Sequence, residues 1–260
     1  MSAGKEGSVR AILYALGANF GIAVSKFGAA WWTNSGSMLA EAIHSTADCV
    51  NQLLLLLGMR EARRPESADH PLGHHRVTYF WSMIVALLLF FMGGAFSVYE
   101  GIERLRHPHP LENGLVALLV LGVAVVLEAF SLAGAMREIR KVAHGKPFLR
   151  WFRETRESEL MVVAGEDIAA LAGLTLAFCA VAAALATGNP LWDALGTISV
   201  GVVLMVIAVL VMIEVKGLIV GESASPELRE EIQTFVAAQP EVAEVLNVIT
   251  LAWGDKVVIA

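Results

Sequence analysis

Long apolar runs recur along most of this chain, and they restrict its fold more than any other feature. A helix needs about 20 apolar residues to cross the hydrocarbon core of a bilayer. Runs of that length lie at 10–32, 36–59, 77–103, 111–136, 160–187 and 191–220. In lipid, a helix satisfies all of its backbone polar groups within one segment. The sequence therefore predicts an all-α membrane domain of six helices over residues 1–221.

The composition agrees with a membrane location. Hydrophobic residues make up 56% of the chain, which is more than soluble globular domains usually contain. Cys49 and Cys179 lie in separate apolar runs, so we expect neither a disulfide framework nor a paired-cysteine zinc motif. Membrane lipid is an expected partner, and nucleic acid is not.

Positively charged residues are unequally divided between the links that join the apolar runs. The N-terminus, 60–76 and 137–157 carry thirteen Lys and Arg residues, against Arg104 and Arg106 on the opposite side. Basic loops tend to remain on the cytoplasmic side of a membrane. Both termini are therefore predicted to be cytoplasmic, in the plasma (inner) membrane if the protein is bacterial.

The pattern changes after residue 221. Ser225 and Pro226 are a helix start signal, and PELREEIQTFVAAQ reads as an amphipathic helix. VAEVLNVITLAW and KVVIA read as strands joined by a turn at Gly254 and Asp255. One helix and two strands do not make a self-sufficient domain. Residues 222–260 are therefore expected to be the truncated start of a cytoplasmic α+β domain.

Ionisable residues inside the apolar runs point to a metal site. His44 and Asp48 are four residues apart, so they share one face of a helix, and Asp167 lies in another run. Imidazole nitrogen and carboxylate oxygen together suit divalent transition metals, and both release metal when protonated. We therefore predict that His44, Asp48 and Asp167 bind a metal ion. The alternative for His44 is a hydrogen bond between helices.

The roles of three further residues remain open at this level. Glu166 points about 100° away from Asp167 on a helix, so it can be a fourth ligand, a base beside the ligands or a partner for another helix. His70 and His74 flank a Pro-x-Gly turn. They can form a second, weaker metal site or belong to a solvated loop.

Several segments resemble the cation diffusion facilitator family of zinc-transporter-like cation efflux proteins. They are SMLAEAIHSTAD, HPLGHHR, YEGIERLRHP and GEDIAALAGL. The resemblance covers essentially the whole chain. It implies six transmembrane helices followed by a ferredoxin-like, metallochaperone-like cytoplasmic domain, and it implies a homodimer. It also implies export of a divalent metal from the cytoplasm in exchange for protons.

The resemblance assigns His44, Asp48 and Asp167 to the transport site, and His70 and His74 to a second site. The family usually has His or Asp four residues before the aspartate of the fifth span, where this chain has Val163. The E-D-x-A-A sequence that begins at Glu166 resembles one subgroup of the family. The fourth ligand is then Glu166, Asn51 or water.

The expected function is therefore a proton-coupled antiporter that works by alternating access. Zinc is the first candidate for the transported metal, and a more oxygen-rich site makes manganese, iron or cobalt alternatives. No catalytic cofactor or enzymatic activity is expected, because the chain has no HExxH and no nucleotide-binding loop. The competing hypothesis is a metal-binding membrane scaffold or partner subunit that transports nothing.

Overall fold

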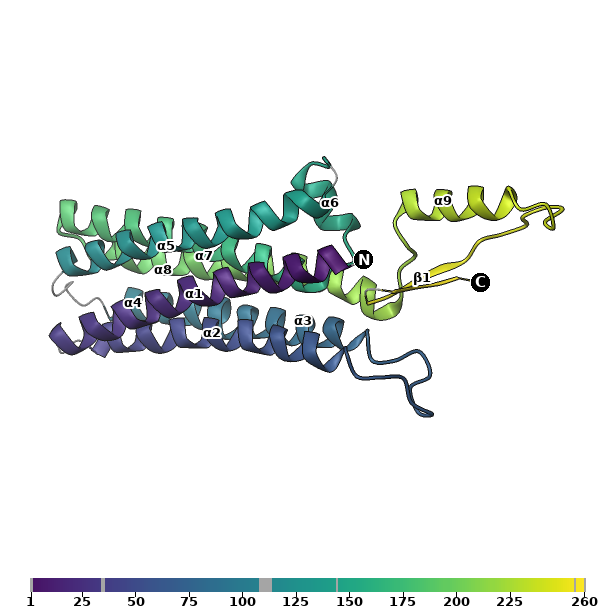
Figure 1. The fold of residues 1–260 in the computed structure, drawn as a ribbon. Coiled ribbons are helices and arrows are strands. Elements are labelled where there is room, and N and C mark those ends of the chain that lie inside the picture. The colour runs from purple at the N-terminus through teal and green to yellow at the C-terminus, as the bar shows by residue number, and fades with distance from the viewer. Residues whose placement is uncertain (1, 34–35, 108–113, 144, 255, 260) are drawn as a thin grey trace.

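The computed structural model describes residues 2–33, 36–107, 114–143, 145–254 and 256–259, of which 2–8, 29–30, 32–33, 36–44 and 256–259 are described without their side chains. Its long helices run side by side as one bundle, and a smaller tail lies at one end (Figure 1). The helices of the bundle are α1 Ser2–Thr33, α2 Gly36–Glu61, α3 Val77–Leu88, η1 Leu89–Ala95, α4 Phe96–Arg106, α5 Gly114–Val142, α7 Ser158–Thr187 and α8 Leu191–Val220. The short helix α6, Phe148–Glu154, lies in the basic link after α5.

Five parts of the bundle are long and apolar enough to cross a membrane. Among the described residues they are Val9–Gly28, Val77–Arg106, Gly114–Val142, Ser158–Thr187 and Leu191–Val220. The other predicted span, 36–59, forms α2, a helix of 26 residues. Its polar residues lower its hydropathy, and most of its first half is described without side chains, so its crossing of the membrane remains a prediction.

The apolar core is concentrated in the half of the bundle that lies nearest the tail. The helices α1, α2, α3, α5, α7 and α8 contribute residues there from the ends that face the tail. Fully buried examples are Ile12, Leu55, Tyr79, Leu160 and Val215. The other half of the bundle exposes many large apolar side chains, including Leu115, Leu119, Leu191 and Trp192. Such an apolar surface is what a membrane domain presents to lipid.

The third predicted span contains a feature that has no signal in the sequence. Between α3 and α4, the segment η1 is a π-helix, in which the backbone turn is wider than in an α-helix. It packs against α8 through glycines: a Cβ atom added at Gly201 would lie 2.6 Å from the Gly94 carbonyl oxygen. The backbones of the third and sixth spans are therefore in direct contact at this point.

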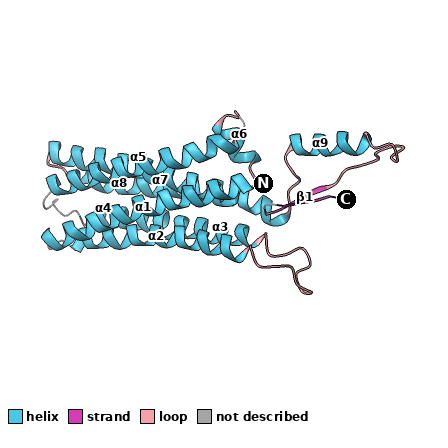
Figure 2. Ribbon diagram, in the orientation of Figure 1, coloured by secondary structure: helices cyan, strands magenta, loops and turns pink. Residues whose placement is uncertain are grey.

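The tail partly matches its predicted elements. It contains α9 Pro226–Ala237 and two antiparallel strands, β1 Thr250–Trp253 and β2 Lys256–Ile259 (Figure 2). Ser225 caps α9 by accepting a hydrogen bond from the Leu228 backbone N–H. The first strand is much shorter than predicted, because 242–249 form no strand. Asp255 of the predicted turn lies outside the described residues.

The β1–β2 hairpin is docked on the end of α3 and on the preceding loop. The buried Tyr79 hydroxyl accepts a hydrogen bond from the Gly254 N–H at 3.0 Å and donates one to the Gly254 carbonyl at 3.3 Å. Trp253 donates from Nε1 to the Leu72 carbonyl at 3.0 Å. The Arg76 guanidinium lies 4.7 Å from the centroid of the Trp253 ring. The hairpin therefore contacts the membrane domain through several specific bonds.

Gly254→Ala is expected to release this hairpin. Gly254 has φ +64°, which disfavours any side chain, and an added Cβ would lie 2.5 Å from the His75 carbonyl oxygen. The expected result is faster proteolysis of the tail, by about tenfold, since docking would lose roughly 1–2 kcal/mol. Limited proteolysis in detergent measures this rate. Gly145→Ala is the matched control, because Gly145 has φ +78° but no atom within 4 Å of the added Cβ. Equal rates for the two variants would contradict the docking.

Candidate metal site

A buried carboxylate connects α2 with α7. Glu166 of α7 is only 3% exposed. Its Oε1 accepts a hydrogen bond of 2.8 Å from Asn51 Nδ2, and its Oε2 accepts one of 2.8 Å from Gln52 Nε2. Two amides from adjacent residues of α2 therefore engage both oxygens of Glu166. Three roles were considered for Glu166. This contact is the one expected if Glu166 is a hydrogen-bond partner for another helix.

The same polar network extends to α1. Asn19 donates from Nδ2 to Gln52 Oε1 at 3.2 Å, and both side chains are buried. Elsewhere along the same pair of helices, Lys26 donates from Nζ to Ser45 Oγ at 2.9 Å. Polar groups inside a membrane domain are costly unless they find partners. These contacts therefore fix how α1 and α2 are rotated toward each other and, through Gln52, toward α7.

Asp167, the next residue of α7, contacts a different helix. It is 1% exposed, and its Oδ2 accepts a hydrogen bond of 2.9 Å from Ser131 Oγ of α5. Because consecutive residues of a helix point about 100° apart, Glu166 can bond to α2 while Asp167 bonds to α5. The acidic pair therefore joins three helices of the bundle.

Two more acidic residues belong to the same region. Glu128 of α5 is buried and interacts electrostatically with Asp167, Asp48 and Glu166. Asp48, on α2, is half-buried and also interacts with Glu166. Like charges that are brought together away from water repel strongly. Bound protons, a bound cation or the Lys26 ammonium, which also interacts with Glu128, would relieve this repulsion.

The predicted ligands are described unequally. Asp48 and Asp167 lie in this acidic region, but the side chain of His44 lies outside the described residues. Among the side chains that the structure describes, no group of three His, Cys, Asp or Glu residues is arranged to hold a metal ion. Val163, where the family usually has a ligand, is fully buried among apolar residues. The assignment of His44, Asp48 and Asp167 to a metal therefore remains a prediction.

The loop before α3 brings its two predicted histidines together. The rings of His70 and His74 lie with their centroids 4.3 Å apart and with their planes at 32°. His74 Nδ1 is enclosed and accepts or donates no hydrogen bond in the described part of the chain. No third metal-binding side chain joins them among the described residues. The contact fits the predicted spacing, and metal binding there remains a prediction.

Two residues of the site were not identified from the sequence. Gln52 follows His44 and Asp48 at the same spacing of four residues, so all three lie on one line along α2. That repeat could have identified Gln52 from the sequence. Ser131 gave no comparable signal, because serine in an apolar helix often bonds to the carbonyl four residues before it. Only the packing of α5 on α7 reveals its contact with Asp167.

Most of the chain is similar to known proteins. Residues 12–219 match the cation efflux transmembrane domain. The mitochondrial proton-coupled zinc antiporter of Xenopus laevis is 35% identical over 222 residues, which is 84% of this chain and 40% of that protein. Metal tolerance protein C4 of Arabidopsis thaliana is 32% identical over 232 residues, or 88% of this chain and 50% of that protein.

A bacterial relative matches a shorter part. The zinc transporter ZitB of Escherichia coli is 30% identical over 129 residues, which is 49% of this chain and 41% of that protein. The chain thus spans half or less of the length of each of these relatives.

Proposed function

This chain belongs to the cation efflux family, and from that premise we propose that it carries a divalent metal ion across a membrane in exchange for protons. The observation that carries the proposal is the meeting of α2 and α7 at Glu166, Asn51 and Gln52. Asp48 of α2 interacts electrostatically with Glu166 of α7, and the proposal adds His44, four residues before Asp48, as a further ligand. The metal would bind between these two helices.

Charge balance supports His44, Asp48 and Asp167 as the ligands. Two ionised carboxylates and a neutral imidazole neutralise a divalent cation, so the loaded site has no net charge to bury. The empty site becomes neutral when both carboxylates take up protons. Exchange of one divalent cation for protons therefore keeps the buried charge low in both states of the cycle. His70 and His74 would form a second, weaker site at the end of the bundle that bears the tail.

We assign Glu166 a supporting role and not that of a fourth ligand. Each of its oxygens accepts a hydrogen bond from an amide of α2, and these bonds orient the carboxylate toward that helix. Water would then complete the coordination of the metal. Asn51 donates to Glu166 through Nδ2, and its Oδ1 is the atom that could bind an ion.

Zinc is the first candidate substrate, because the frog and bacterial relatives are named as zinc transporters. Manganese, iron and cobalt remain alternatives, since a site with two carboxylates and one imidazole accepts them. We propose transport out of the cytoplasm by alternating access, in a homodimer whose termini are cytoplasmic. The half of the bundle that is closely packed near the tail and the more open half would be rearranged during the cycle.

The test is transport by purified protein in vesicles with an imposed proton gradient. Uptake of zinc, manganese, iron, cobalt and cadmium is compared between the wild type and His44→Ala. We expect one metal to be taken up and its initial rate to fall at least about tenfold in the variant, because one ligand is lost. Metal binding that depends on His44 without any flux would instead identify a metal-binding scaffold. Equal uptake by both proteins would remove His44 from the site.

A further inference from the structure

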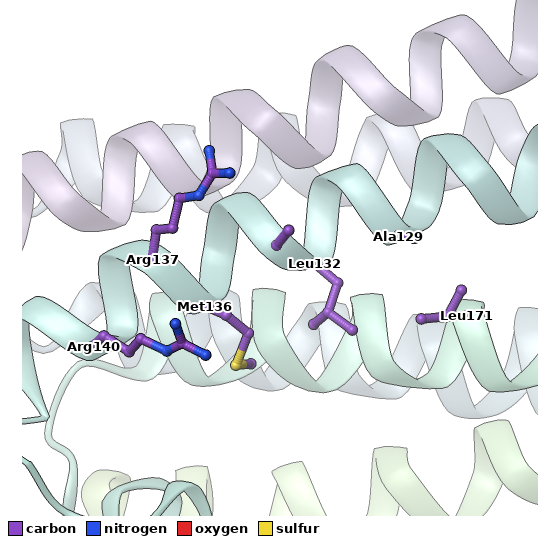
Figure 3. Close-up of a pocket in the computed structure, with 7 residues that line it drawn as sticks. Ala129, Leu132, Met136, Arg137, Arg140 and Leu171 are labelled. Carbon is purple, nitrogen blue, oxygen red and sulfur yellow. The ribbon is translucent and has the colours of Figure 1, made fainter.

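An open groove runs along the outer side of α5, next to α7. It has a volume of about 400 Å³ and is lined by Ala129, Leu132, Ala133, Met136, Arg137, Arg140 and Leu171. Figure 3 shows Arg137 and Arg140 at one end of the groove and Leu171 toward the other. All but Leu171 come from one stripe of α5, with apolar residues first and the two arginines after them. The groove is therefore apolar along its length and cationic at one end.

The change from apolar to cationic lining coincides with the depth of a bilayer. Counted from Gly114 at the start of α5, Arg137 is about 35 Å along the helix axis at 1.5 Å per residue. The hydrocarbon core of a bilayer is about 30 Å thick. With the hydrocarbon core taken to begin at Gly114, Ala129, Leu132 and Ala133 lie at the depth of the acyl chains, Met136 lies at the boundary, and the arginines lie at the level of the lipid headgroups.

The two arginines are not neutralised by the protein. Neighbouring cations near the same end of the bundle have acidic partners: Lys141 pairs with Glu138 at 2.7 Å, and Arg156 pairs with Glu222 at 2.8 Å. Arg137 and Arg140 form no ion pair or hydrogen bond with any described residue. Both are exposed and lie three residues apart, so side-chain rotation can bring both guanidinium groups to one anion.

We propose that this groove binds an anionic phospholipid. The phosphate would contact Arg137 and Arg140, which match a phosphate through paired N–H donors. One acyl chain would lie over Ala129, Ala133 and Leu171. Small residues at 129 and 133 leave room for the chain, and the negative charge of the cytoplasmic leaflet favours such lipids at a basic helix end. The proposal does not depend on transport activity.

The site also lies close to the acidic region of the bundle. Ser131, which bonds to Asp167, is next to Leu132 in the sequence, and Leu171 is one helical turn beyond Asp167. A lipid in the groove would therefore contact both α5 and α7 beside their buried hydrogen bond. Occupancy of the groove would hold these two helices together.

The test is a binding titration followed by native mass spectrometry of the whole chain in detergent. The probes are phosphatidylglycerol and phosphatidylcholine with identical acyl chains. In the double variant Arg137→Gln/Arg140→Gln, affinity for phosphatidylglycerol should fall about 25-fold, or about fivefold for each arginine. Binding of phosphatidylcholine should not change. Arg60→Gln/Arg63→Gln is the matched control, because it removes two exposed arginines near the same end but outside the groove.

A third variant separates lipid binding from attraction of anions in general. Ala133→Phe fills the apolar part of the groove and keeps both arginines, so it should also weaken phosphatidylglycerol binding, by at least fivefold. Unchanged binding in this variant would overturn the proposal, because the arginines would then attract any phosphate. A change in oligomeric state without loss of lipid would assign the groove to a second copy and would also overturn it. Equal affinities of the two double variants would do the same.

Discussion

Asp167→Asn is expected to reduce proton-driven metal uptake by at least about 100-fold. Loss of a residue that merely supports a metal ligand costs about 10- to 100-fold in metal affinity or activity, and Asp167 is a proposed ligand itself. Asparagine keeps the volume and can still accept the hydrogen bond from Ser131. It cannot neutralise a cation or carry a proton. The initial rate of uptake in vesicles, with the metal identified for the wild type, measures the effect.

Two further substitutions show whether this loss is specific. Ser131→Ala removes the hydrogen bond of 2.9 Å to Asp167 and keeps its charge. It should raise the metal concentration for half-maximal uptake by about tenfold and change the maximal rate less. Asp193→Asn is the control for loss of an acidic group. Asp193 lies in the first turn of α8 and pairs with Arg104 of α4 at 2.6 Å. If Asp193→Asn stopped uptake as completely as Asp167→Asn, the effect could not be assigned to a metal ligand.

The membrane helices were predictable from the sequence because their ends are marked by glycine, which can adopt a positive φ, and by proline, which fixes φ. The predicted span 191–220 is identical to α8, and 160–187 differs from α7 by two residues at its start. Gly188, with φ +68°, ends α7, and Pro190 precedes α8. Apolar length and such end signals are local properties, and they remain informative without knowledge of the neighbours.

Other features of the fold depend on contacts that no local pattern contains. The π-helix η1 has no sequence signal of its own, and it lies where Gly94 meets the backbone of α8. Alternating apolar residues in 242–249 suggested a strand, but an isolated strand without a partner is not stable. Only Thr250–Trp253 finds one, in β2. Contacts with other segments therefore determine both the π-helix and the length of β1.

The site was predictable to the extent that it follows helical spacing. The spacing of His44 and Asp48 placed two candidate ligands on one face, and the apolar surroundings made their charge notable. Spacing alone did not identify the partners of Glu166 and Asp167, because these come from two other helices, α2 and α5. The amide of Gln52 is the clearest case. Its four-residue spacing from Asp48 was visible, but its bond to Glu166 is a tertiary contact between side chains of α2 and α7.

Gly201→Ala is expected to destabilise the folded bundle by about 3 kcal/mol or more. The added Cβ would lie 2.6 Å from the Gly94 carbonyl oxygen and 2.7 Å from the Val98 backbone nitrogen. Overpacking of a well-packed interior usually costs about 1–3 kcal/mol. Here the cost should reach or exceed that range, because backbone atoms cannot rotate away as side chains can. The midpoint of unfolding in detergent, followed by circular dichroism, measures the change.

Gly17→Ala is the matched control for this substitution. Gly17 lies within a long helix too, but no atom lies within 4 Å of a Cβ added there. Alanine is the better helix former, so this variant should be as stable as the wild type or up to about 1 kcal/mol more stable. The two variants add the same methyl group, so their difference isolates the contact between η1 and α8. Equal stability of both would mean that η1 and α8 pack farther apart than this contact requires.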